Sequence, residues 1–72
     1  MMAKEEPSWQ PTHVLSFKGM KITVMVDDDT GDAHTAEEWA ECDSARWHRS
    51  PDGFWTFEGR FPERLKVVRL NA

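Results

Sequence analysis

The sequence predicts a small α+β domain, with one short helix on a mostly antiparallel sheet of four to five strands, in the order ββαβββ. Three observations predict it: two hairpins with readable registers, a helix-capping pattern between them, and a branched apolar segment at residues 65–70 that follows as a last strand. A chain of 72 residues buries too little surface to support two cores. We therefore expect a single domain over residues 12–72.

Residues 1–11 are polar and include Pro7 and Pro11, which interrupt any regular element. We expect them to form a flexible tail that is disordered or loosely docked through Trp9. The sequence has no apolar run that approaches the roughly 20 residues needed to span a bilayer, and its start lacks the apolar centre of a signal peptide. The single cysteine, Cys42, excludes an internal disulfide, so these features favour a soluble cytoplasmic protein.

The first hairpin is predicted to turn at Lys18 and Gly19, which pairs Phe17 with Met20. Period-two alternation then places six apolar side chains on one face of the two strands. We expect this face to be buried; its residues are Leu15, Phe17, Met20, Ile22, Val24 and Val26.

A helix is predicted to begin after Thr35, because Thr35 and Glu38 have the spacing of a capping box. The helix is short and ends near Asp43 or Ser44. Its apolar face, with Ala36, Trp39 and Ala40, is expected to pack on the sheet, and His34 to stack toward Trp39. The acidic side chains are expected to project from the opposite side; they are Glu37, Glu38 and Glu41.

The second hairpin is predicted at Ser-Pro-Asp-Gly, residues 50–53, a type I turn closed by a left-handed glycine. This turn pairs Trp47 with Phe57 and Arg49 with Trp55 on the core side, with the Arg49 guanidinium over Trp55. The other side is solvated and carries cross-strand pairs, namely His48 with Thr56 and Arg46 with Glu58.

The strongest functional signal is a window of acidic residues that contains no lysine or arginine. Such a block attracts cationic surfaces and repels phosphate, although it also keeps a small protein soluble. Glutamates three and four residues apart on a helix repel each other. This cost favours a role in partner binding over a role in helix stability or solubility alone. We predict a partner-binding surface made of Asp27, Asp28, Asp29, Asp32, Glu37, Glu38, Glu41 and Asp43.

Calcium binding is a second interpretation of the same residues. Asp27, Asp29 and Glu38 occupy the first, third and twelfth places of a twelve-residue loop. Gly31 and Asp32 then fall at the fifth and sixth places, where an EF-hand needs a ligand and a glycine. The pattern therefore predicts no metal site of that class.

Catalysis has little support in the sequence. His13, His34 and His48 belong to different elements, and nothing cationic lies beside Cys42 to activate it. The glycines are isolated, so there is no phosphate-binding loop. We predict no enzyme activity, no catalytic residues and no cofactor.

Single-stranded nucleic-acid binding is another alternative, because bases and aromatics interleave along the second hairpin. The predicted register, however, sends Trp47 and Trp55 toward the core. The net charge of −4 also opposes contact with phosphates. Direct nucleic-acid binding is thus the less favoured reading; it would use Arg46, Trp47, His48, Arg49, Phe54, Trp55, Phe57 and Arg60.

These features favour a non-enzymatic interaction protein that docks on a basic, nucleic-acid-handling surface of a partner protein and inhibits it, with its carboxylates imitating phosphates. In size, acidity and layout the chain resembles small inhibitors encoded by phages and mobile elements, anti-CRISPR proteins among them. The resemblance rests on residues 27–43 and on length. It implies a partner in a bacterial defence complex, such as a CRISPR effector subunit, met in the host cytoplasm. The alternative is a small accessory or antitoxin-like regulatory subunit.

Overall fold

The computed structural model describes residues 8–70. Within that range six strands form one antiparallel sheet, and a single helix lies between the third and fourth strands. The elements in chain order are β1 (His13–Phe17), β2 (Met20–Val26), β3 (Asp32–His34), α1 (Ala36–Ala40), β4 (Trp47–Arg49), β5 (Trp55–Phe57) and β6 (Lys66–Arg69).

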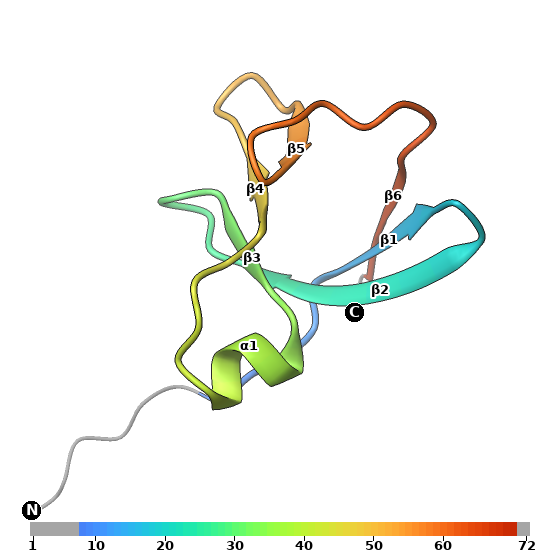
Figure 1. Cartoon of the computed structure of the whole chain (residues 1–72). Helices are drawn as coiled ribbons and strands as arrows, with labels where there is room; N and C mark the ends of the chain where they lie inside the picture. Colours follow the sequence, from blue (N-terminus) through green and yellow to red (C-terminus); the bar gives the residue numbers. More distant parts are fainter. Residues whose placement is uncertain (1–7, 71–72) are drawn as a thin grey trace, which may run out of the picture.

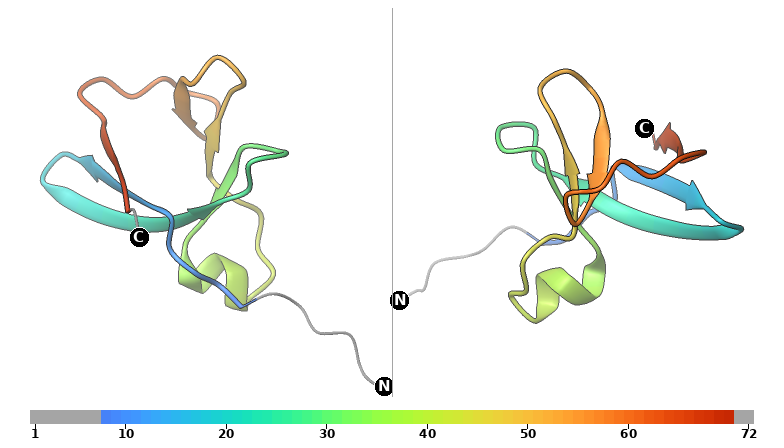
Figure 2. Two further views of the ribbon diagram at one scale, coloured as in Figure 1. Left: turned by 180° about the vertical axis from the view of Figure 1, so that it is seen from behind. Right: turned by 45° about the horizontal axis from the view of Figure 1, so that its top comes forward.

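The strands follow the order β5-β4-β3-β2-β1-β6, so that the last strand pairs with the first. The sheet curls, which brings its two outermost strands, β5 and β6, to the same side of the molecule (Figures 1 and 2). Helix α1 lies at the other end, beyond β3 (Figure 1). The molecule is thus an open, partly rolled sheet with one short helix, and it is mostly β.

The prediction of four to five strands is too low, because it missed β3, and the observed order is βββαβββ. The segment Asp-Ala-His contains one apolar side chain, Ala33, and no β-branched residue, so it lacks the composition of a strand. It becomes one because β2 and β4 flank it on both sides; Ala33 pairs with Val26 and with Trp47. Tertiary pairing therefore decides this element.

The registers predicted for both hairpins are confirmed. In the first, Phe17 pairs with Met20, and the two turn residues have φ angles of 52° and 79°, as the mirror-image turn requires. In the second, Trp47 pairs with Phe57 and Arg49 with Trp55.

The buried core consists of Leu15, Val24, Val26, Ala33 and Trp47. Of the face predicted from alternation, Leu15, Val24 and Val26 are buried, Phe17 and Ile22 are partly buried against this core, and Met20 is 56% exposed. Met20 lies at the tip of the β1–β2 hairpin, which extends past the rest of the sheet (Figure 1). Alternation predicts the face on which Met20 lies, but not whether another element covers that face at the hairpin tip.

The capping box is confirmed at both of its hydrogen bonds. The Glu38 backbone N–H donates to Thr35 Oγ1 at 3.2 Å, and the Thr35 backbone N–H donates to Glu38 Oε1 at 3.0 Å. The helix is shorter than predicted, since Glu41 is already its C-cap. The prediction that its whole apolar face packs on the sheet is also wrong in part, because Ala36 and Ala40 are exposed.

Glu38 does not project into solvent as predicted, because it is only 6% exposed. The capping box folds its carboxylate back toward the start of the helix, where Arg46 Nε donates to Oε2 at 3.2 Å. The ion pair and the cap together satisfy both oxygens of this buried group.

The N-terminal approach to the sheet is held by Trp9, whose indole Nε1 donates to the carbonyl of His34 at 2.9 Å. Thr12 precedes β1, and its backbone N–H donates a hydrogen bond to the carbonyl of Val24 at 2.9 Å. Residues 1–7 of the predicted tail lie outside the described residues. Within residues 8–70 no helix has the length and hydropathy to cross a membrane.

Candidate docking site between the acidic loop and the helix

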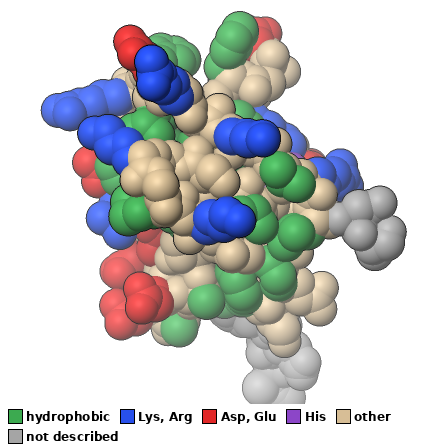
Figure 3. Space-filling view, turned by 90° about the vertical axis from the view of Figure 1, so that its right-hand side faces the viewer, with side chains coloured by type: hydrophobic (Ala, Val, Ile, Leu, Met, Phe, Trp, Pro, Cys, Tyr) green, Lys and Arg blue, Asp and Glu red, His purple; other side chains and the backbone are tan. Residues whose placement is uncertain are grey.

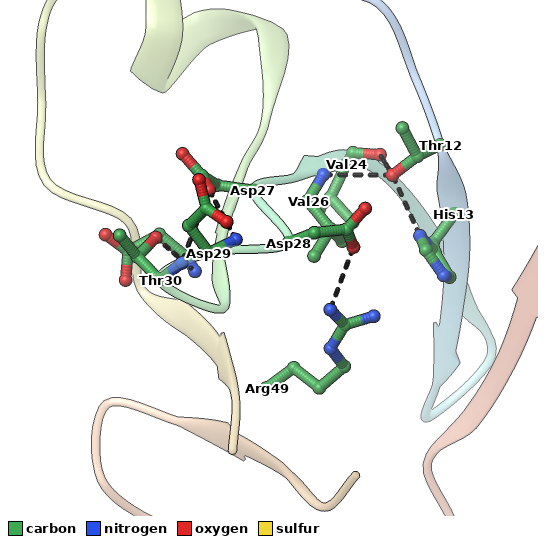
Figure 4. A network of polar contacts seen from close by, with 10 residues as sticks. Thr12, His13, Val24, Val26, Asp27, Asp28, Asp29, Thr30 and Arg49 are labelled. Atoms are coloured by element: carbon green, nitrogen blue, oxygen red, sulfur yellow. Dashed lines mark hydrogen bonds and ion pairs between the residues drawn. The ribbon is translucent and has the colours of Figure 1, made fainter. Parts of the chain in front are cut away.

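The acidic loop, residues 27–31 between β2 and β3, has a defined shape (Figure 4). Asp27 Oδ1 accepts hydrogen bonds from the backbone N–H groups of Asp29 (2.8 Å) and Thr30 (3.3 Å). The Asp27 N–H donates to the carbonyl of Asp32, and the Gly31 N–H donates to the carbonyl of Asp27. Asp27 thus uses one carboxylate oxygen to organise the loop.

The loop is also fixed to β4. The Arg49 backbone N–H donates to the carbonyl of Gly31 at 2.7 Å, and Arg49 Nη2 donates to Asp28 Oδ1 at 2.9 Å (Figure 4). The Arg49 guanidinium therefore contacts Asp28 and does not lie over Trp55 as predicted. The sheet order explains the difference, because β3 places the acidic loop beside β4.

Three of the eight predicted site residues contact bases of β4 or of the residue before it. Asp28 forms an ion pair with Arg49 (2.9 Å) and Glu38 with Arg46 (3.2 Å). Asp32 Oδ1 lies 3.1 Å from His48 Nδ1, a contact that is an ion pair only when His48 is protonated. The acidic window contains no base of its own, but the neighbouring strand supplies them. Part of the predicted charge is therefore balanced inside the molecule.

Five of the predicted site residues are exposed and form no ion pair within residues 8–70. Two belong to the acidic loop and three to α1 and the residues that follow it. These five form the free acidic set: Asp27, Asp29, Glu37, Glu41 and Asp43.

A hollow of about 320 Å³ lies between the acidic loop and α1. Trp39 of α1 forms one wall, and its ring meets His34 edge-on at 5.4 Å between centroids, which confirms the predicted stacking. The hollow is mainly apolar, with Asp27 and Asp32 among its lining residues. The full lining is Met25, Val26, Asp27, Thr30, Asp32, His34 and Trp39.

A second, smaller hollow of about 190 Å³ is also lined by Trp39 and His34. Its other residues are Glu38, Cys42 and Asp43. The Trp39–His34 pair is therefore shared by two depressions, each with two acidic residues in its lining. We call the larger one, over Met25, the Trp39 hollow.

The Trp39 hollow has the chemistry to accept a side chain with an apolar stem and a cationic head. The stem of a lysine or arginine packs on apolar surface while the head stays near water, and a cation is attracted both by carboxylates and by an indole face. Sequence reasoning found the acids and the aromatic pair. It missed the hollow, because Met25 and Val26 come from a different element than Trp39.

His13 takes part in a buried polar network at the start of β1 (Figure 4). Thr12 Oγ1 lies 2.8 Å from His13 Nδ1 and accepts a hydrogen bond from the Val26 backbone N–H at 2.9 Å. The Thr12 hydroxyl also lies 3.5 Å from the carbonyl of Val24, so it can accept from a protonated Nδ1 or donate to an unprotonated one. His13 itself is buried, at 8% exposed.

The pKa of His13 is lowered from 6.5 by burial and, secondarily, by the positive charges of Arg49 and Arg69, while Asp28 acts in the opposite direction. The unfolded chain therefore binds a proton at a higher pH than the folded one. We expect the free energy of unfolding to fall as the pH drops below 6.5, and to level off below the folded-state pKa.

Urea midpoints measured from about pH 8 to about pH 5 check this pH dependence. The variant His13→Gln should show a flatter profile than the parent chain over that range. An equally steep decline in both proteins would assign the pH dependence to other groups.

Within residues 8–70, no three His, Cys, Asp or Glu side chains gather in a way that could hold a metal ion. No family model, curated protein or solved structure matches this chain significantly. The features of this chain that bear on function are the Trp39 hollow and the free acidic set.

Proposed function

We propose that this chain is a non-enzymatic interaction protein that docks on a basic, nucleic-acid-handling surface of a partner protein and inhibits it, in the manner of an anti-CRISPR protein. The observation that carries the proposal is the apolar Trp39 hollow, with Asp27 in its lining and exposed carboxylates on the elements at both sides. Such a surface combines apolar contact with negative charge.

The charge would act first, during encounter. The free acidic set has no internal counter-charge within residues 8–70, so its field reaches solvent and attracts a cationic partner. This attraction raises the association rate and weakens with salt. The paired acids, such as Asp28 with Arg49, contribute less because their charge is already balanced.

The Trp39 hollow would then hold the complex together. A partner arginine or lysine that enters it buries its stem against Trp39 and places its head near Asp27. Surfaces that bind nucleic acids are rich in these two side chains. A partner groove occupied in this way is no longer open to DNA or RNA, and this competition is the proposed inhibition.

A charge-reversal experiment tests the proposal. Purified CRISPR effector complexes are mixed with their labelled target DNA, and the added chain is titrated in an electrophoretic mobility-shift assay. The parent chain should prevent DNA binding by at least one such effector. The triple variant should lose at least about tenfold in potency, because several charge contacts are reversed at once; it combines Asp29→Lys, Glu37→Lys and Glu41→Lys.

A control variant of equal charge change separates a local effect from net charge. It reverses the three acids of residues 44–70, which lie outside the site, and should inhibit as the parent does; it combines Asp52→Lys, Glu58→Lys and Glu63→Lys. The Trp39→Ala variant should also be weak, through a faster dissociation rate. Equal potency of the two triple variants, or no inhibition of any effector, would reject the proposed function.

A further inference from the structure

A second groove lies between the two ends of the curled sheet, away from the Trp39 hollow. It has a volume of about 290 Å³, and its walls come from the turn before β5, from β5, from the following loop and from β6. Apart from Gly53, the residues that line it all have apolar side chains: Phe54, Trp55, Phe61, Pro62, Leu65 and Val67. We call it the β5–β6 groove.

Two aromatic side chains at this groove are largely in water, since Phe54 is 63% exposed and Phe61 is 71% exposed. On β6, Val67 lines the groove, whereas Val68 and Leu70, exposed at 47% and 42%, alternate with it and lie on the other face of the strand. Figure 3 looks at the side of the molecule that carries β6, and shows hydrophobic and Lys or Arg side chains gathered there. Exposed apolar side chains that gather in this way mark binding surfaces.

The groove runs beside an open strand edge. β5 and β6 are the outermost strands, so each has one neighbour in the sheet. Phe57 of β5 exchanges two backbone hydrogen bonds with Arg60, at 2.8 and 2.9 Å, which covers part of the β5 edge. Within residues 8–70, β6 pairs only with β1, and its outer edge offers backbone groups to a further strand.

The hydrogen bonds that join the β6 segment to the β1 segment show which backbone N–H groups of β6 point to its open edge. The Leu70 backbone N–H donates inward to Thr12, at 2.8 Å. Because N–H directions alternate along a strand, the N–H of Arg69 points to the open edge. A strand added beside β6 would meet this donor.

The cations near this edge lack internal partners. Four bases lie in the loop before β6 and on β6 itself, and none forms an ion pair within residues 8–70; they are Arg60, Arg64, Lys66 and Arg69. In two copies of this chain, like charges would repel each other and oppose β6–β6 pairing. The same charges attract a strand that carries carboxylates.

We propose that the β5–β6 groove binds an extended acidic peptide segment of a partner protein, which pairs with the open edge of β6. Its apolar side chains, at alternate positions, lie in the groove against Trp55 and Phe61, and the carboxylates between them lie on the other face of β6, where Lys66 projects. The backbone pairing gives affinity, and the groove and charges give specificity. This site is separate from the Trp39 hollow and goes beyond the function proposed above.

A peptide fits this site better than single-stranded nucleic acid does. Residues 50–70 carry four bases and three acids, a net charge of only +1, so a run of phosphates would meet nearly as much repulsion as attraction. A peptide with one or two carboxylates needs only local pairing. Phosphate oxygens can accept from a backbone N–H, but nucleic acid lacks the alternating donors and acceptors with which a strand pairs along the β6 edge.

A selection from a random twelve-residue peptide library on the full chain tests the proposal. The enriched peptides should alternate apolar residues with aspartate or glutamate. Synthetic copies of them should bind Phe61→Ala at least about tenfold more weakly than the parent, because a large apolar contact is lost. The variant reversed at Asp29, Glu37 and Glu41 should bind them as the parent does, which separates this site from the Trp39 hollow.

A matched pair of variants isolates the backbone contact. Arg69→Ala removes the side-chain charge, and Arg69→Pro removes in addition the N–H that points to the open edge. The peptides should bind Arg69→Pro at least about fivefold more weakly than Arg69→Ala. If Arg69→Pro fails to fold, the loss of affinity in Phe61→Ala decides the question alone.

Three results would overturn this proposal. The first is a selection without enrichment in acidic apolar sequences. The second is equal peptide affinity in the parent and Phe61→Ala. The third is tighter binding of a labelled oligodeoxythymidylate than of the peptides, with the same dependence on Phe61, which would assign the groove to single-stranded nucleic acid.

Discussion

The Gly31→Ala variant is expected to melt at least about 12 °C below the parent chain, or to be largely unfolded at room temperature. Gly31 has φ +84°, and a Cβ added there would lie 2.0 Å from the carbonyl oxygen of Arg49. That oxygen belongs to β4, whose Arg49 N–H is bonded to the Gly31 carbonyl at 2.7 Å, so neither backbone moves freely.

The expected cost combines two effects. A left-handed φ costs about 1–2 kcal/mol for an alanine, and the clash with backbone must be relieved by moving the acidic loop away from β4, for a total of about 3 kcal/mol or more. Chains of this size are stable by only about 4–11 kcal/mol. Thermal unfolding followed by circular dichroism measures the shift.

Gly53→Ala is the matched control. Gly53 has φ +93°, close to that of Gly31, but an added Cβ meets nothing within 4 Å. Only the conformational cost remains, so this variant should lose about 1–2 kcal/mol. Similar melting temperatures for the two variants would show that the contact between the acidic loop and β4 is not tight in solution.

Trp47→Ala is the second variant expected to have a large effect, with a loss of about 3–5 kcal/mol. Trp47 is 3% exposed, and its ring lies 4.7 Å from that of Phe57 and 6.3 Å from that of Phe17, measured between centroids. Removing it leaves a cavity at the point where β3, β4 and β5 meet the first hairpin. Urea unfolding measures the loss.

Phe61→Ala serves as the control for Trp47→Ala, since it also removes an aromatic side chain but one that is 71% exposed. Its stability should change by no more than about 0.5 kcal/mol. If Trp47→Ala also lost no more than about 0.5 kcal/mol, the placement of Trp47 in the core would be contradicted. Near-complete unfolding of Trp47→Ala would agree with that placement.

The sequence determined the local parts of this fold. Both hairpin registers and the capping box of Thr35 and Glu38 follow from turn residues and short spacings, and these interactions join residues close in the chain. The buried alternation of β1 and β2 follows from period two in the same way. Such patterns are readable because their partners are close in sequence.

The acidic window shows where sequence reasoning stops. Its carboxylates were visible as a block of charge, but the partners of Asp28, Asp32 and Glu38 come from β4 and the residue before it. That proximity depends on β3, a strand whose own residues carry little strand signal. Which carboxylates stay free could therefore not be predicted.

The sequence by itself thus determined the hairpins, the start of the helix and the acidic character of residues 27–43. Only the tertiary structure decided that β3 forms, that basic residues contact three of the carboxylates, and that Met25 and Trp39 enclose a hollow. The physical reason is the distance along the chain between the residues that interact. Turns and caps are stabilised by neighbours a few residues away, whereas ion pairs and hollows arise between segments that only the curled sheet brings together.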